Sequence, residues 1–148
     1  MTTAQKLTIT REFDAPLELV WQAITDPDHV AHWFGPEGFE TPRESIEIDL
    51  RTGGRYELDM VMAGSHHPVR YQITELDPPR LLVLTSPPMP EFGIPEATVT
   101  RIELEDLGQT TRMSLSDGPY EQPGHAEAGW HGALAKLDAL LSRLRRLP

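Results

Sequence analysis

The sequence predicts an α+β protein in which a curved antiparallel sheet wraps around one long C-terminal helix. Apolar residues recur at i, i+3, i+4 and i+7 through residues 124–145, the spacing that puts side chains on one face of a helix. Most of residues 42–116 instead alternate apolar and polar with period two, which is typical of strands with one buried face. A helix with one apolar stripe needs a partner, and a curved sheet is the natural one.

The N-terminal part is expected to contain one strand and two short helices. Alternation predicts a strand over residues 6–13, and a helix follows with Pro16 in its first turn. Asp26 then caps a second short helix, which ends at Gly35-Pro36. The apolar residues of these three elements are Leu7, Ile9, Phe13, Leu17, Val20, Trp21, Ile24, Val30, Trp33 and Phe34.

Four turn signals divide the rest into an antiparallel meander. They are Thr52-Gly53-Gly54, residues 63–68, Asp77-Pro78-Pro79 and Leu107-Gly108. The residues expected on the inner face are Ile46, Ile48, Leu50, Tyr56, Leu58, Met60, Met62, Val69, Tyr71, Ile73, Ile102, Leu104, Met113 and Leu115.

Two segments between these strands are expected to lie outside the sheet. Residues 86–95 contain too many prolines for a central strand, so we expect a rim loop that folds Met89, Phe92 and Ile94 inward. Asp117-Gly118-Pro119 is expected to leave the last strand and lead to the closing helix.

Composition argues against two classes of partner. A net charge of −10 argues against binding nucleic acid or an anionic membrane, since phosphates would meet more carboxylates than cations. The one basic cluster, Arg143, Arg145 and Arg146, falls in the last turn of the predicted helix, where cations complement the helix dipole. With no cysteine, no signal-peptide core and no membrane-length apolar run, we expect a cytoplasmic protein.

Five short segments, in order, carry the signature of a known family. They are Phe13-Asp14-Ala15-Pro16, Val20-Trp21, Thr25-Asp26-Pro27, Trp33-Phe34-Gly35-Pro36-Glu37-Gly38-Phe39 and Asp49-Leu50-Arg51-Thr52-Gly53-Gly54-Arg55-Tyr56. From about Thr8 to Leu144, the chain resembles the activator of heat-shock-protein-90 ATPase homologue-like family of the START-like (SRPBCC) superfamily. The resemblance implies a helix-grip fold, and we expect residues 1–148 to form a single START-like domain with a cavity between sheet and helix.

Three functions stay open under this resemblance. Binding of a hydrophobic or amphipathic small molecule, lipids included, is the one we favour. The second is a cyclase-like or hydrolytic enzyme acting on an aromatic or polyketide-type substrate, and we lean against an enzyme. The third is activation of the heat-shock-protein-90 ATPase. In the co-chaperone that names the family another domain comes first, whereas here a strand is predicted close to Met1, so we expect no preceding domain and rank this role last. Relatives often form dimers, and the sequence does not distinguish a homodimer from a monomer, so both stay open.

Aromatic and methionine side chains are the candidate ligand contacts. Tyr56, Tyr71 and Trp130 come first, because an apolar core would leave their polar groups unsatisfied. The simpler alternative is that all of these residues are core. The seven candidates are Trp33, Phe34, Tyr56, Met60, Tyr71, Phe92 and Trp130.

Catalytic and metal-binding signals are weak. His29 and His32 could share a helix face and His66 and His67 share a turn, but no carboxylate or thiolate completes a metal-ligand spacing. We therefore expect no metal and no cofactor. No serine lies in a nucleophile context. An inward orientation of Arg70, Arg101 or Glu103 would favour acid–base chemistry, although an outer-face position is the more common one.

The closing helix is expected to divide into two functional halves. Gly129 and Gly132 interrupt its first half at about 1 kcal/mol each relative to alanine, while residues 134–144 carry an unbroken leucine stripe. We expect the leucine half to be core and the half around Trp130 to border the cavity. Trp130→Ala would then cost ligand affinity more than stability.

Overall fold

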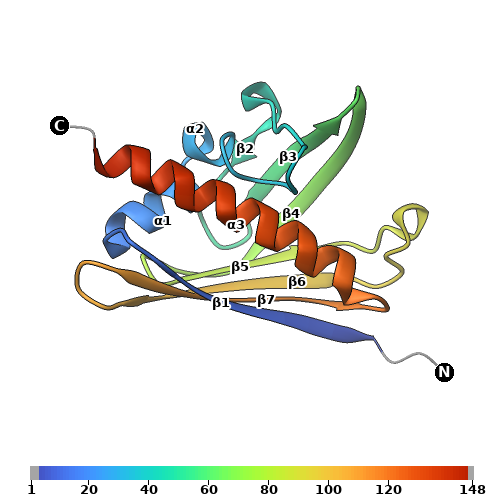
Figure 1. Ribbon diagram of the computed structural model, residues 1–148. Helices are drawn as coiled ribbons and strands as arrows, with labels where there is room; N and C mark the ends of the chain where they lie inside the picture. The colour runs from blue at the N-terminus through green and yellow to red at the C-terminus, as the bar shows by residue number, and fades with distance from the viewer. Residues whose placement is uncertain (1–3, 147–148) are drawn as a thin grey trace.

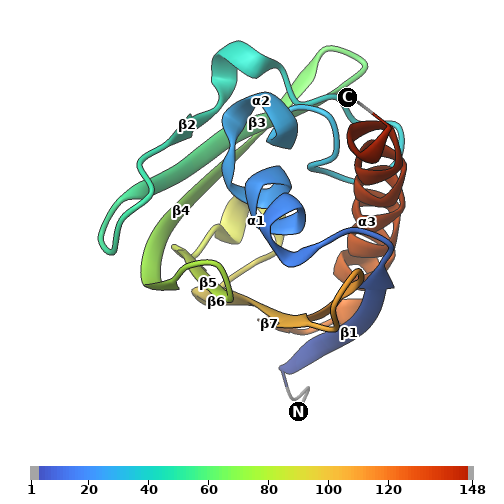
Figure 2. The ribbon, with the colours of Figure 1, turned by 90° about the vertical axis from the view of Figure 1, so that its left-hand side faces the viewer.

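The structure is a computed structural model that describes residues 4–146, and the side chain of Phe92 also lies outside the described part. One seven-stranded antiparallel sheet has the order β1-β7-β6-β5-β4-β3-β2 (Figure 1). The sheet curves, with α1 and α2 inside the curve and α3 along its open side (Figure 2). The predicted helix-grip fold is confirmed. The elements are β1 (Gln5–Phe13), α1 (Leu17–Thr25), α2 (Pro27–Val30), η1 (Arg43–Ser45), β2 (Glu47–Ile48), β3 (Arg55–Met62), β4 (Ser65–Asp77), β5 (Leu81–Ser86), η2 (Pro90–Phe92), β6 (Thr98–Asp106), β7 (Thr111–Tyr120) and α3 (Pro123–Arg145).

Period-two alternation predicts the inner face of the last hairpin correctly. Ile102 and Leu104 of β6 stand opposite Leu115 and Met113 of β7, and all four side chains are buried. On the concave side this surface meets α3, whose apolar stripe packs against β1 and β7. The buried residues of α3 are Trp130, Ala133, Leu134, Leu137, Leu140 and Leu141.

The first hairpin departs from the prediction at both ends. Leu50 is 41% exposed because β2 ends at Ile48, so the chain has left the sheet before it reaches this residue. Met62 is 39% exposed because it is the last residue of β3, at the turn into β4. Nearer the middle of the hairpin, where other elements cover the sheet, Tyr56 and Leu58 are buried as expected.

The rim loop is only partly as predicted. Met89 and Ile94 are half-buried and pair with each other through an isolated bridge, with the Met89 amide 2.7 Å from the Ile94 carbonyl oxygen. The predicted inward position of the Phe92 side chain lies outside the described residues.

The last strand continues further than predicted, through Asp117-Gly118-Pro119 to Tyr120. Gly118 has a φ of 140°, and a Cβ there would lie 2.9 Å from the Cα of Lys6 in the neighbouring strand β1. Glycine thus permits a close approach of β1 that keeps the segment in the sheet. As a result Asp117 is an inward-facing strand residue.

Gly132 has a similar role in α3, where a Cβ would lie 2.9 Å from the backbone nitrogen of Glu37. We expect Gly132→Ala to lower the free energy of unfolding, because the clash with a backbone atom outweighs a helix-propensity gain of about 1 kcal/mol. Gly124→Ala, in the first turn of the same helix with open space around it, is the matched control and is expected to leave stability unchanged or raise it. Urea denaturation measures both. A more stable Gly132→Ala protein would contradict the prediction.

Candidate functional site

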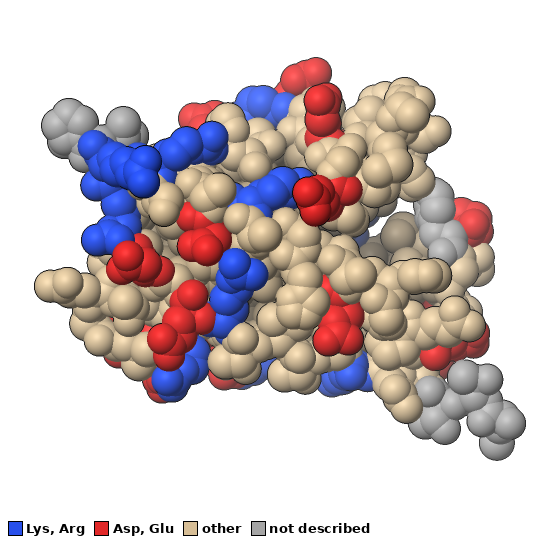
Figure 3. Space-filling model, viewed as in Figure 1, with Lys and Arg blue, Asp and Glu red and all other residues tan. Residues whose placement is uncertain are grey.

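A cavity of about 160 Å³ lies between β3, β4 and β7 and the first half of α3. Figure 3 shows a hollow on this side of the molecule, between the β3–β4 hairpin and the first turns of α3. Aromatic rings and small side chains make most of its wall. The lining residues are Phe34, Gly35, Pro36, Met60, Val69, Tyr71, Asp117, Tyr120, His125, Ala126, Gly129, Trp130 and Ala133.

The first half of α3 leaves space for the cavity because several of its lining side chains are small. Gly129, Ala126 and Ala133 line it with minimal side chains. Pro36, which also lines the cavity, approaches the helix so closely that a Cβ at Gly129 would lie 3.2 Å from its ring. The two helix glycines therefore serve the packing of the segment after α2, while the small residues leave space beside it.

One carboxylate is buried in the wall. Asp117 is 2% exposed, and its Oδ1 accepts a hydrogen bond from the Thr100 hydroxyl at 2.9 Å. Its Oδ2 accepts from the Tyr120 hydroxyl and from the Trp130 indole N–H, both at 2.8 Å. All three donors are neutral side chains, so these hydrogen bonds bring no positive charge to the carboxylate.

Burial acts on all three tyrosines of the chain. Burial raises the pKa of Tyr56. For Tyr71 and Tyr120, burial and the negative charge of the nearby Asp117 carboxylate both raise the pKa. An unfolded tyrosine has a pKa of about 10. The contribution of these neutral tyrosines to the free energy of unfolding is therefore fully present below about pH 10 and is progressively lost above it. We expect no tyrosinate absorbance in the folded protein near pH 10, whereas the urea-unfolded chain titrates there. A reversible titration near pH 10 without unfolding would contradict this.

Four of the seven candidate ligand contacts line the cavity together. Phe34, Met60, Tyr71 and Trp130 come from the segment after α2, from β3, from β4 and from α3. The rings of Phe34 and Trp130 meet edge to face, with centroids 5.9 Å apart. Whether these residues contact a ligand stays a prediction.

Trp33 and Tyr56 lie in the core, away from the cavity wall. The Trp33 indole donates to the Ala23 carbonyl oxygen at 2.9 Å, and the Tyr56 hydroxyl donates to that of Ile24 at 2.8 Å. Both carbonyls belong to the last turn of α1, where helix carbonyls have no partner within the helix. The Tyr56 hydroxyl, which suggested ligand contact, thus completes a helix end, as does the Trp33 indole N–H. The side chain of Phe92 lies outside the described residues.

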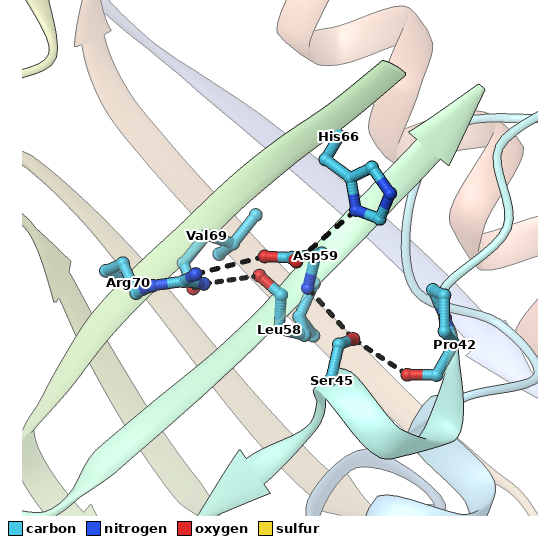
Figure 4. A network of polar contacts seen from close by, with 7 residues as sticks. All are labelled: Pro42, Ser45, Leu58, Asp59, His66, Val69 and Arg70. Carbon is cyan, nitrogen blue, oxygen red and sulfur yellow. Dashed lines mark hydrogen bonds and ion pairs between the residues drawn. The ribbon is translucent and has the colours of Figure 1, made fainter. Parts of the chain in front are cut away.

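The alternative inward orientation of Arg70, Arg101 and Glu103 is wrong. Arg70 lies on the outer face, where it donates to the Leu58 and Val69 carbonyl oxygens and pairs with Asp59 at 3.0 Å (Figure 4). Arg101 pairs with Glu103 at 2.6 Å, and both side chains are about half exposed. Solvated cross-strand and same-strand pairs of this kind add little stability.

The same outer-face cluster connects η1 to β3. The Ser45 hydroxyl accepts from the Asp59 amide and donates to the Pro42 carbonyl, which ties η1 to β3 (Figure 4). His66 lies 3.5 Å from the other Asp59 oxygen. With Asp59 and Arg70 facing outward, their strand neighbours Met60 and Val69 face the cavity.

No metal or membrane signal emerges from residues 4–146. No group of three or more His, Cys, Asp or Glu residues within this range could hold a metal ion. No helix there has both the length and the apolar character needed to cross a membrane.

Three polar side chains of the cavity, those of Asp117, Tyr120 and His125, were not among the sequence candidates. Asp117 was expected in the segment that leaves the last strand. For Asp117 the signal is in the sequence, because Met113, Leu115 and Asp117 continue one period-two series. The turn-forming Asp-Gly-Pro composition outweighed that signal.

A curved sheet gripping a C-terminal helix, with a cavity between them, defines a START-like helix-grip protein. The family model described as "Activator of Hsp90 ATPase homolog 1-like protein" matches residues 14–142, and the chain belongs to this family. The resemblance drawn from the sequence motifs is confirmed.

Solved structures of the same fold come from several bacteria. A protein from Chromobacterium violaceum is 28% identical with a TM-score of 0.82, and the match covers 92% of this chain and 96% of that one. A protein from Arthrobacter aurescens is 25% identical with a TM-score of 0.82, covering 95% and 87%. CalU16 from Micromonospora echinospora is 26% identical with a TM-score of 0.64, covering 94% and 77%. Among curated proteins, none matches the chain.

Proposed function

We propose that this protein binds a small hydrophobic or amphipathic molecule in the cavity between the sheet and the first half of α3. The observation that carries the proposal is the lining itself, in which four aromatic rings and one buried carboxylate surround about 160 Å³. Ligand sites in proteins are concave and mostly apolar, with a few polar groups that set orientation.

The volume suits a ligand group about the size of one ring. An apolar cavity of about 150 Å³ in another protein binds benzene. Burying roughly 150 Å² of apolar ligand surface would contribute about 4 kcal/mol before the cost of association. A larger ligand would project into the adjoining groove, which shares Tyr120, His125 and Ala126 with the cavity and continues past Gly93 and Ile94.

Native mass spectrometry of protein purified from its own host tests the proposal directly. We expect a small molecule to co-purify with the protein. If the protein is denatured to remove its ligand and then refolded, we expect it to bind the ligand again from a host extract. Quenching of Trp130 fluorescence then reports binding in solution, because this indole lies in the cavity wall.

A cavity-filling variant ties that binding to this site. We expect Ala126→Leu to weaken binding at least about 10-fold, because the larger side chain occupies space that the ligand needs. Ala128→Leu makes the same change at an exposed position of the same helix and is expected to leave affinity unchanged. Equal affinity in both variants would contradict the proposed location.

Enzymatic turnover is the second candidate, favoured by the convergence of polar groups inside the cavity. Asp117 and the Tyr71 and Tyr120 side chains all line it, and acid–base chemistry needs one or two such groups near a bound substrate. A panel of aromatic and polyketide-type thioesters, followed by mass spectrometry of the products, tests this candidate. Tyr71→Phe is expected to abolish turnover and the outer-face Arg101→Ala to preserve it. No product, or full activity in Tyr71→Phe, would dispose of it.

A further inference from the structure

Asp117 is a buried carboxylate without a cationic partner. Its side chain lines the cavity, and its three hydrogen-bond donors are the neutral groups of Thr100, Tyr120 and Trp130. Among residues 4–146, no lysine, arginine or histidine nitrogen lies within 4.0 Å of either carboxylate oxygen. An ionised carboxylate only accepts hydrogen bonds, which is what Asp117 does in all three contacts.

Asp117 lines the cavity, and its carboxylate has acceptor capacity that the protein's own donors do not use. A carboxylate offers about four acceptor positions, of which three are used, with one bond on Oδ1 and two on Oδ2. A buried charge that lacks an opposite charge is costly to maintain, so a cationic ligand would remove a penalty that an apolar ligand leaves in place.

The walls around this carboxylate are those that stabilise organic cations. The rings of Phe34, Tyr71, Tyr120 and Trp130 line one cavity, and the faces of aromatic rings attract ammonium groups. No lysine or arginine occurs among the described residues of the cavity or of the adjoining groove, to which Glu121 adds another carboxylate. His125 is the one basic side chain there, and it is exposed.

We propose that the ligand is a small organic ammonium ion, with its charged group on Asp117 and an apolar group of about one ring against the aromatic walls. This inference rests on the proposed binding function and specifies its ligand class. It also excludes ligand classes, since a carboxylate or phosphate in this cavity would meet the uncompensated charge of Asp117 in a low dielectric.

A charge series of probes tests the inference on the unmodified protein. The probes are 2-phenylethylammonium, 2-phenylethanol and 3-phenylpropionate, which share one ring and a short chain but carry positive, no and negative charge. Binding is measured by calorimetric titration at about pH 8. We expect the ammonium probe to bind at least about 10-fold more tightly than the alcohol, because a charge-assisted hydrogen bond is stronger than a neutral one. We expect the propionate to bind most weakly.

Asp117→Asn then locates the effect. We expect this variant to reduce the affinity for the ammonium probe to that for the alcohol, while the alcohol binds as before. Asp138→Asn, which changes a half-exposed carboxylate of α3 paired with Arg11, is the matched control and is expected to change neither affinity. Circular dichroism checks that each variant is folded. If Asp117→Asn does not fold, the probe series on the unmodified protein still tests the ligand class.

The outcomes separate this inference from the function on which it rests. Equal or tighter binding of the alcohol or the propionate overturns the ammonium proposal while supporting ring binding in the cavity. Absence of ammonium binding also overturns it, and co-purified ligand in native mass spectrometry then decides the binding function by itself. Preferential ammonium binding that survives in a folded Asp117→Asn protein overturns the assigned position.

Discussion

Leu137→Ala is expected to destabilise the fold by about 2–5 kcal/mol, among the largest effects of any single substitution in this chain. Leu137 is fully buried in the second half of α3 and takes no part in the cavity wall. Chemical denaturation measures the loss of stability. Leu144→Ala, at a half-buried position in the last turn of α3, is expected to destabilise the fold less. Binding per folded molecule is expected to be unchanged in Leu137→Ala.

That result, set beside Ala126→Leu, tests the division of α3 into two halves. Leu137→Ala is expected to lower stability without changing affinity. Ala126→Leu is expected to lower affinity without lowering stability. For Trp130→Ala, the structure adds a stability cost to the expected loss of affinity, because Trp130 is itself buried and donates to Asp117. Its truncation is expected to cost stability as well as affinity. A loss of affinity in folded Leu137→Ala would contradict the division.

Asp117→Ala is the second substitution with a large expected effect. It leaves the Thr100 hydroxyl, the Tyr120 hydroxyl and the Trp130 indole without their acceptor. Each buried donor that loses its partner costs about 1–3 kcal/mol, less where water from the cavity replaces the carboxylate. We expect a total loss of a few kcal/mol in urea denaturation.

Asp138→Ala is the control for that measurement. Asp138 pairs with Arg11 at 3.3 Å, but its side chain is 50% exposed, so the pair is expected to contribute no more than about 1 kcal/mol. Equal losses in the two variants would mean that Asp117 is not a stabilising buried acceptor.

Much of the fold could be predicted because its signals are local. The alternation of Ile102 and Leu104 with polar residues specifies which face of β6 is buried, whatever lies opposite. The spacing of Leu134, Leu137 and Leu141 specifies the buried stripe of α3 in the same way. Both periodicities follow from backbone geometry alone.

The candidate site could be predicted only in part because its contacts are non-local. Trp33 and Phe34 are adjacent in the sequence, yet one completes the end of α1 and the other lines the cavity. Nothing in the local pattern separates them, because the separation depends on where the α1 carbonyls lie after folding. The same is true of Tyr56 and Tyr71, which are paired across β3 and β4.

By itself, then, the sequence determined the order of the main elements, most of the buried faces and the family. Only the tertiary structure decided which buried polar groups face the cavity. Asp117 joins it because β1 passes close enough to Gly118 to keep that segment in the sheet, and because Trp130 then comes within 2.8 Å. The physical reason is that side-chain periodicity assigns a face, whereas a hydrogen-bond partner is assigned by packing between segments that are distant in the chain.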